Sequence, residues 1–151
     1  MNDPRVLYSA DEIRSRVAEV AGAIANDYRD RQLVLVGMLK GAAFFLADLA
    51  RFIPRPVDYE FVSVTSSIGA HGEVVSLTFA TQVDVSDRHV LILKDVFHSG
   101  ITENYLITHL SQQNPASFQV VPHELAMRSA PFSPASTEPR AGCLPNYGTF
   151  P

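Results

Sequence analysis

The stretch that decides the fold is Val90-Leu-Ile-Leu-Lys-Asp-Val-Phe-His-Ser-Gly-Ile-Thr102. Its first four residues, Val90 to Leu93, form a short apolar run, which is typical of a strand buried on both faces of a parallel sheet. A polar, glycine-bearing segment then separates this run from a helical pattern that begins near Thr102. The stretch therefore predicts a strand, a loop and a helix in succession.

The polar residues of this stretch fall at the carboxyl end of the predicted strand, where open α/β sheets bind ligands. Charged side chains, hydroxyls and an imidazole gather there: Lys94, Asp95, His98, Ser99 and Thr102. Gly100 permits close approach of the backbone, and free amides at the start of a helix favour an anion. The sequence thus predicts a loop that binds phosphate.

A second strand, loop and helix precede this unit in the chain. Leu33 to Val36 is a buried-strand run, and it is followed by Gly37-Met-Leu-Lys-Gly41 and a helical run from Ala42 to Ile53. The ammonium of Lys40 and the amides at the helix start suit an anion. A turn glycine beside a solvated surface lysine is the other interpretation, and this segment alone does not decide between them.

The remaining segments predict a scaffold around these two loops. Ser9-Ala-Asp-Glu12 has the form of a capping box at the start of an amphipathic helix. Val57 to Val64 and Val74 to Thr81 favour two strands of a hairpin, joined by the glycine-bearing segment Thr65 to Gly72 as a flexible loop. Ser117 to Val121 favours a further strand.

Composition excludes several classes of protein. A chain of 151 residues with 46% hydrophobic residues suits one compact domain, and its net charge of −4 offers no basic surface for nucleic acid. The single cysteine, Cys143, builds no disulfide within the chain and suits the reducing cytoplasm. No apolar run reaches the roughly 18 residues of a membrane-spanning helix. We therefore expect a cytoplasmic protein without a membrane partner.

The stretch from Val90 to Thr102 resembles the phosphoribosyl pyrophosphate signature of the type I phosphoribosyltransferases, and most of all that of the hypoxanthine-guanine enzymes. The family pattern is four apolar residues, Glu-Asp, two apolar residues and Asp-Thr-Gly-x-Thr. This chain has Lys94-Asp95, Val96-Phe97 and then His98-Ser99-Gly100-Ile101-Thr102. Leu39-Lys40-Gly41 is similar to a family segment that contacts pyrophosphate through backbone amides and often contains a cis peptide.

The resemblance covers residues 5–121 and implies a single-domain phosphoribosyltransferase-like α/β fold. Such a fold has a central, mainly parallel sheet flanked by helices, with a flexible hairpin loop. Residues 122–151 hold six of the ten prolines and no sustained apolar periodicity. We expect an irregular carboxyl-terminal tail there.

The function implied by the resemblance is transfer of ribose 5-phosphate from phosphoribosyl pyrophosphate to a purine base, with Mg²⁺ and in a homodimer or homotetramer. Asp95 and His98 correspond to catalytic positions, and Asp95 to a metal ligand acting through water. The substrate-binding positions implied in the same way are Leu39, Lys40, Gly41, Lys94, Asp95, His98, Ser99, Gly100, Ile101 and Thr102.

The chain departs from the family pattern at three places. Lys94 replaces a carboxylate, and His98 replaces the aspartate that takes a purine proton. No lysine follows Lys94 and no aspartate follows Asp95, so the family's purine-binding residues have no match in the tail. A second hypothesis is therefore a catalytically inactive descendant that binds a nucleotide or phosphoribosyl ligand, or that serves as a regulatory or assembly subunit.

Overall fold

The structure is a computed structural model that describes residues 7–69, 72–80, 84–95 and 101–122. Its elements in chain order are α1 (Ala10–Asp27), β1 (Leu33–Leu39), α2 (Ala42–Phe52), β2 (Asp58–Gly69), β3 (Gly72–Phe79), β4 (His89–Lys94), α3 (Ile101–Ser111) and β5 (Ser117–Pro122). The strands form one sheet in the order β3-β2-β1-β4-β5. Only the β2–β3 pair is antiparallel, which confirms the predicted, mainly parallel sheet.

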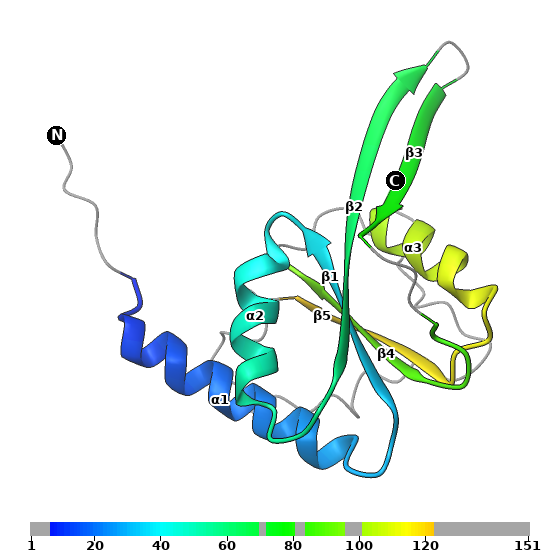
Figure 1. Ribbon diagram of the computed structural model, residues 1–151. Helices are drawn as coiled ribbons and strands as arrows, with labels where there is room; N and C mark the ends of the chain where they lie inside the picture. The colour runs from blue at the N-terminus through cyan, green and yellow to red at the C-terminus, as the bar shows by residue number, and fades with distance from the viewer. Residues whose placement is uncertain (1–6, 70–71, 81–83, 96–100, 123–151) are drawn as a thin grey trace, which may run out of the picture.

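Helices cover both faces of this sheet. Helices α1 and α2 lie on one face and α3 lies on the other (Figure 1). Along β4, Leu91 and Leu93 pack in the core beneath α1 and α2, whereas Val90 and Ile92 pack in the core beneath α3. Burial on both faces explains why the strand is an uninterrupted apolar run rather than an alternating one.

Helix α1 begins with the predicted capping box. The backbone N–H of Glu12 donates to the Ser9 hydroxyl at 3.2 Å, and the Ser9 N–H donates to the Glu12 carboxylate at 2.6 Å. Hydrogen bonds from the Ser9 backbone and then from its hydroxyl hold the pKa of Glu12 below its ordinary value. The apolar side of the helix, at Val17, Val20 and Ile24, is buried against the sheet layer.

Strand β1 is longer than the sequence predicted. The predicted strand stopped at Val36, but β1 continues through Gly37 to Leu39. A Cβ at Gly37 would lie 2.7 Å from Leu46 of α2 and 3.1 Å from Phe61 of β2. The missing side chain therefore lets α2 approach the sheet closely, so Gly37 is a packing residue of the strand and not a residue of the loop.

The β2–β3 hairpin confirms one prediction and corrects another. A hairpin is present, but most of the predicted loop from Thr65 to Gly72 is strand. The antiparallel pairing runs from Val62↔Phe79 to Gly69↔Gly72. Continued pairing gives the backbone N–H and C=O groups of these residues hydrogen-bond partners. The hairpin projects beyond the carboxyl ends of β1 and β4 (Figure 1). His71 lies outside the described residues.

Among the described helices, none combines the length and the apolar character that crossing a membrane would require.

Candidate functional site

The two predicted loops begin at the carboxyl ends of neighbouring parallel strands. Strands β1 and β4 pair in parallel, with Gly37 opposite Leu93. The chain leaves β1 for α2 on one face of the sheet and leaves β4 for α3 on the other face (Figure 1). Strands whose connections depart to opposite faces form a topological switch point, which is where open α/β sheets bind ligands.

Gly41 and Asp95 bring these two loops into contact. A Cβ at Gly41 would lie 2.6 Å from the Cβ of Asp95 and would overlap the Asp95 carboxylate. Gly41 has ordinary helical dihedrals, φ −62° and ψ −37°, so glycine is required here for space and not for an unusual backbone conformation. The loop after β1 therefore packs directly on the carboxylate at the end of β4.

The loop after β1 has one feature that the resemblance implied, a cis peptide. The Leu39–Lys40 peptide is cis. The Lys40 side chain is exposed, and no side chain caps the amino terminus of α2 at Gly41. An exposed ammonium beside amides at a helix start provides donors for an anion at the same edge where Asp95 lies.

Lys94 is the last residue of β4 and Asp95 follows the strand, and the two side chains make contacts with different helical units, Lys94 with α3 and Asp95 with Gly41 at the start of α2. The Lys94 ammonium forms an ion pair with Glu103 in the first turn of α3, and the two side chains are 12% and 2% exposed. Asp95 is exposed and lies against Gly41, on the α2 side. The structure therefore directs the charge of Lys94 beneath α3 and away from the Asp95 carboxylate.

The remaining predicted site residues are only partly described. His98, Ser99 and Gly100 lie outside the described residues, as does the tail beyond residue 122. Ile101 begins α3, and Thr102 follows it as a half-buried residue of the first helical turn. This confirms the predicted start of the helix and places Thr102 at the end of the loop that Asp95 begins.

The described residues offer one carboxylate for a metal at this edge. Within the described ranges, no group of three or more His, Cys, Asp or Glu side chains is arranged to hold an ion. Mg²⁺ in phosphate sites keeps several waters and uses one or two carboxylates together with the substrate's phosphates. The exposed carboxylate of Asp95 fits such an ion, held chiefly by pyrophosphate oxygens and water.

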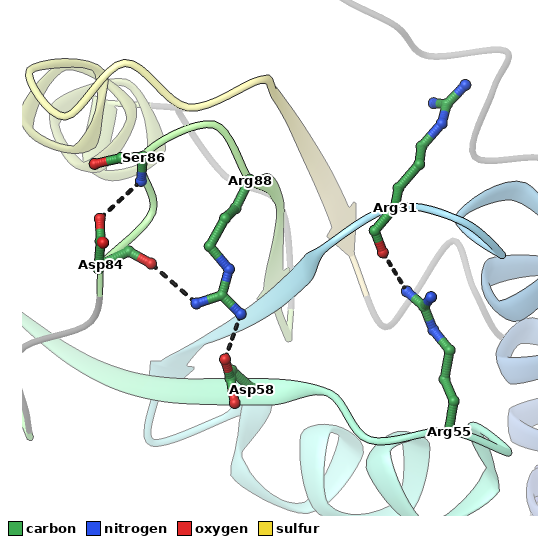
Figure 2. Close-up of polar contacts among 6 residues, drawn as sticks. All are labelled: Arg31, Arg55, Asp58, Asp84, Ser86 and Arg88. Carbon is green, nitrogen blue, oxygen red and sulfur yellow. Dashed lines mark hydrogen bonds and ion pairs between the residues drawn. The ribbon is translucent and has the colours of Figure 1, made fainter.

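Polar residues at the opposite end of the sheet make structural contacts (Figure 2). Arg88 forms an ion pair with Asp58 at the start of β2 and donates to the Asp84 carbonyl at 3.1 Å. Arg55 donates to the carbonyls of Arg29 and Arg31 at 3.0 and 2.9 Å. These arginines tie the loops before β1, β2 and β4 together, so we assign them no part in the site.

Sequence reasoning missed the partner of Lys94. The signal was available, because Glu103 is the only carboxylate between Ile101 and Ser111 and follows Lys94 across one loop. A lone acidic residue in the first turn of a largely apolar helix is favoured by the helix dipole. A basic residue at the end of the preceding strand supplies its counter-ion.

An open, mainly parallel sheet with helices on both faces and two polar loops at its switch point defines an α/β domain of the kind that binds ligands at that point. The sequence profile of the phosphoribosyl transferase domain matches residues 7–122. The chain therefore belongs to the phosphoribosyl transferase domain family.

The chain is 40% identical over 123 residues to the hypoxanthine-guanine phosphoribosyltransferase of Mycobacterium bovis, and the match covers 76% of this chain and 61% of that protein. It thus spans about 61% of the length of this relative.

Solved structures give the same family. A hypoxanthine-guanine phosphoribosyltransferase from Bacillus anthracis superposes with a TM-score of 0.70 at 27% identity, covering 81% of this chain and 71% of that chain. The hypoxanthine phosphoribosyltransferase of Trypanosoma cruzi, in complex with the product IMP, superposes with a TM-score of 0.66 at 34% identity. That match covers 86% of this chain and 80% of that chain.

Proposed function

We propose that this chain transfers ribose 5-phosphate from phosphoribosyl pyrophosphate to hypoxanthine or guanine, a reaction of purine salvage. The observation that carries the proposal is the contact of Gly41 with Asp95 at the switch point of the sheet. This contact supports the proposal because it joins the segment Leu39 to Gly41, which we propose binds pyrophosphate, to Asp95, the carboxylate that the family pattern has at the end of the later strand. The relatives named as hypoxanthine-guanine phosphoribosyltransferases support the choice of base.

The reaction breaks the bond between C1 of the ribose and a pyrophosphate oxygen, and the electron pair leaves with pyrophosphate. A purine nitrogen then bonds to C1 with its lone pair, and the proton of the purine passes to a base. Positive charge develops on the ribose between these events. The protein must therefore bind the leaving pyrophosphate, fix the ribose and accept or direct one proton.

The proposed roles follow the family pattern, and for Leu39 to Gly41 and Asp95 they are supported by the contact of Gly41 with Asp95. Leu39, Lys40 and Gly41 contact pyrophosphate through backbone amides and the Lys40 ammonium. Asp95 accepts from ribose hydroxyls or from water bound to Mg²⁺. Ser99, Gly100, Ile101 and Thr102 bind the 5-phosphate. His98 accepts the purine proton or contacts phosphate.

Mg²⁺, when bound with pyrophosphate, offsets the charge of the leaving group. In our proposal the protein holds this ion only weakly, through Asp95 and water, because Lys94 stands where the family has a second carboxylate. We further propose that the chain associates with itself as a dimer or tetramer, as the resemblance implies. Sedimentation of the purified chain tests that association.

The experiment that tests the function uses the purified chain with phosphoribosyl pyrophosphate, Mg²⁺ and one base at a time: hypoxanthine, guanine, xanthine or adenine. Chromatography then separates any nucleoside monophosphate. Formation of the nucleotide from hypoxanthine or guanine supports the proposal. Absence of nucleotide and of released pyrophosphate with every base overturns it, and calorimetric binding of inosine monophosphate without turnover would identify the inactive binding protein instead.

A further inference from the structure

An ion pair joins the two ends of the loop that carries the predicted 5-phosphate residues. Lys94 is the last residue of β4, and Glu103 lies in the first turn of α3. Their ammonium and carboxylate are in direct contact, although six residues of loop and two of helix separate them in the chain. The pair therefore links strand and helix across the loop that starts at Asp95.

The pair is buried almost completely. The side chain of Glu103 is 2% exposed and that of Lys94 is 12% exposed. One carboxylate oxygen of Glu103, Oε2, is buried without a hydrogen-bond partner among the described residues. Burial removes the water that would stabilise the charge of this carboxylate. The Lys94 ammonium and the amino terminus of α3 stabilise that charge instead.

The partners also lie on a defined side of the sheet. Val90 and Ile92, which precede Lys94 at two-residue spacing in β4, pack in the core beneath α3. Lys94 continues that row to the end of β4, whereas Asp95, which follows the strand, lies against Gly41 at the start of α2. Glu103 is thus positioned to hold the positive charge on the side of the sheet that does not bear the Asp95 carboxylate.

We propose that Glu103 is a positioning residue that retains the Lys94 ammonium beneath α3, and that this retention keeps the Asp95 carboxylate free for the phosphoribosyl ligand. The inference rests on the proposed function and extends it to a residue that contacts no ligand. Lys94 takes no part in ligand binding in this account. The family's lost carboxylate is replaced by an internally neutralised pair.

The proposal predicts a particular consequence of removing the Glu103 charge. In Glu103→Gln the ion pair between Glu103 and Lys94 is lost, while the shape of the residue 103 side chain is kept. The adjacent Asp95 is an exposed carboxylate at this edge of the sheet, and it attracts the Lys94 ammonium once the ion pair with Glu103 is gone. Asp95 then binds the ribose and Mg²⁺-bound water less well, so affinity for phosphoribosyl pyrophosphate falls.

Steady-state kinetics of four variants tests this consequence, at a temperature below the unfolding transition of each. Glu103→Gln should raise the KM for phosphoribosyl pyrophosphate about tenfold and leave the KM for hypoxanthine within about twofold. The double variant Lys94→Met, Glu103→Leu removes both charges and should bring the KM for phosphoribosyl pyrophosphate back to within about threefold of the unaltered chain. Lys94→Met alone should lower the unfolding temperature without the tenfold change in KM.

The fourth variant, Asp58→Asn, is the matched control. It breaks another ion pair between separate elements, that of Asp58 with Arg88, at the far end of the sheet. If each ion pair only stabilises the fold, Asp58→Asn and Glu103→Gln should both lower the unfolding temperature and leave the KM values for phosphoribosyl pyrophosphate and hypoxanthine unchanged. That outcome for Glu103→Gln overturns the proposal.

Two further results would overturn the proposal. A tenfold higher KM in Lys94→Met that persists in the double variant would show that Lys94 contacts the ligand. If Glu103→Gln does not fold, Glu103→Leu replaces it because it also removes the charge, and an unchanged KM for phosphoribosyl pyrophosphate in that variant contradicts the proposal.

Failure of the proposed function gives a different result, because the unaltered chain then forms no nucleotide. If that chain still binds inosine monophosphate, calorimetric dissociation constants replace KM and should show the same pattern. Absence of both turnover and binding in the unaltered chain overturns the function and this inference together.

Discussion

Gly41 lies directly against Asp95, so that a single added carbon at Gly41 would approach the Asp95 Cβ to 2.6 Å. The two residues are far apart in the chain, at the ends of units that begin with β1 and β4. Their contact fixes the distance between the proposed pyrophosphate loop and the proposed ribose carboxylate. Precise spacing matters because the reaction needs both groups placed on one ligand.

Gly41→Ala tests this spacing. The added methyl group must displace Asp95 or the loop, because the contact has no free space. We expect kcat/KM for phosphoribosyl pyrophosphate to fall about a hundredfold. The free energy of unfolding should decrease by about 1–3 kcal/mol, as overpacking of a filled site does. Kinetics and urea unfolding measure the two effects.

Gly22→Ala is the matched control for this substitution. Gly22 lies in α1, and a Cβ there would meet nothing within 4 Å. Alanine should stabilise the helix by about 0.5–1 kcal/mol and leave the kinetics unchanged. Equal activities of the Gly41→Ala chain and the Gly22→Ala chain would show that the Gly41–Asp95 contact does not serve the site.

Asp95→Asn removes the proposed acceptor for ribose hydroxyls and metal-bound water while keeping the side chain's shape. We expect kcat/KM to fall about a hundredfold, since a charged acceptor aimed at the reacting region is replaced by a neutral one. Asp48→Asn, on the exposed side of α2, should have no such effect. Unchanged kinetics in Asp95→Asn would remove Asp95 from the site.

His98 gives a prediction about pH. A neutral imidazole accepts a proton and an imidazolium does not, so a base at His98 makes kcat fall at acidic pH as the imidazole becomes protonated. His98→Gln should lower kcat about a hundredfold and abolish that acidic limb. His109→Gln, whose ring stacks on Phe79 at 5.6 Å, should keep the limb. A retained limb in His98→Gln together with a higher KM for phosphoribosyl pyrophosphate would favour the phosphate contact instead.

Asp84 gives a prediction about stability and pH. Hydrogen bonds from the Ser86 side chain and then from its backbone N–H, at 2.9 Å, lower the pKa of Asp84 below 3.8 (Figure 2). Because the pKa of Asp84 is lower in the folded state, the ionised carboxylate stabilises the fold above pH 3.8. This contribution to the free energy of unfolding is lost as the pH falls through the folded-state pKa.

The measurement is the urea midpoint of the unaltered chain and of Asp84→Asn at several pH values. The unaltered chain should be the more stable at pH 7, and the difference should shrink as the pH falls below 3.8. A difference that is constant with pH would contradict the assigned cause, because only an ionised carboxylate makes the contribution depend on pH.

Much of the scaffold could be predicted from the sequence, because the signals are local. The run from Val90 to Leu93 is buried on both faces of the sheet, as its composition indicates. The Ser9 capping box depends only on residues three apart. The two loops at the carboxyl ends of strands follow from the change from apolar to polar residues.

The extent of the strands was less predictable, because it depends on tertiary packing. Gly37 continues β1 because it pairs with Phe61 on one side and Leu93 on the other, and the absence of a side chain leaves room for Leu46 and Phe61. The hairpin continues to Gly69 because β3 pairs with it, although the glycines and small residues there resemble a loop. Local propensity carries no information on such partners.

The site was predicted in outline and not in its internal contacts. The resemblance put both Lys94 and Asp95 among the substrate-binding positions, and no local pattern indicated that Lys94 forms an ion pair with Glu103 while Asp95 lies against Gly41. The contact between Gly41 and Asp95 joins residues from different loops, and no local pattern specifies it. The predicted roles of His98, Ser99 and Gly100 stay predictions.

The stoichiometry of turnover tests the central claim most directly. The purified chain is given phosphoribosyl pyrophosphate, Mg²⁺ and hypoxanthine, and inosine monophosphate and pyrophosphate are quantified in the same samples over time. Our account predicts that the two products appear together in equal amounts and that Asp95→Asn slows both equally. Absence of inosine monophosphate, or pyrophosphate released without it, would contradict transfer of ribose 5-phosphate by this site.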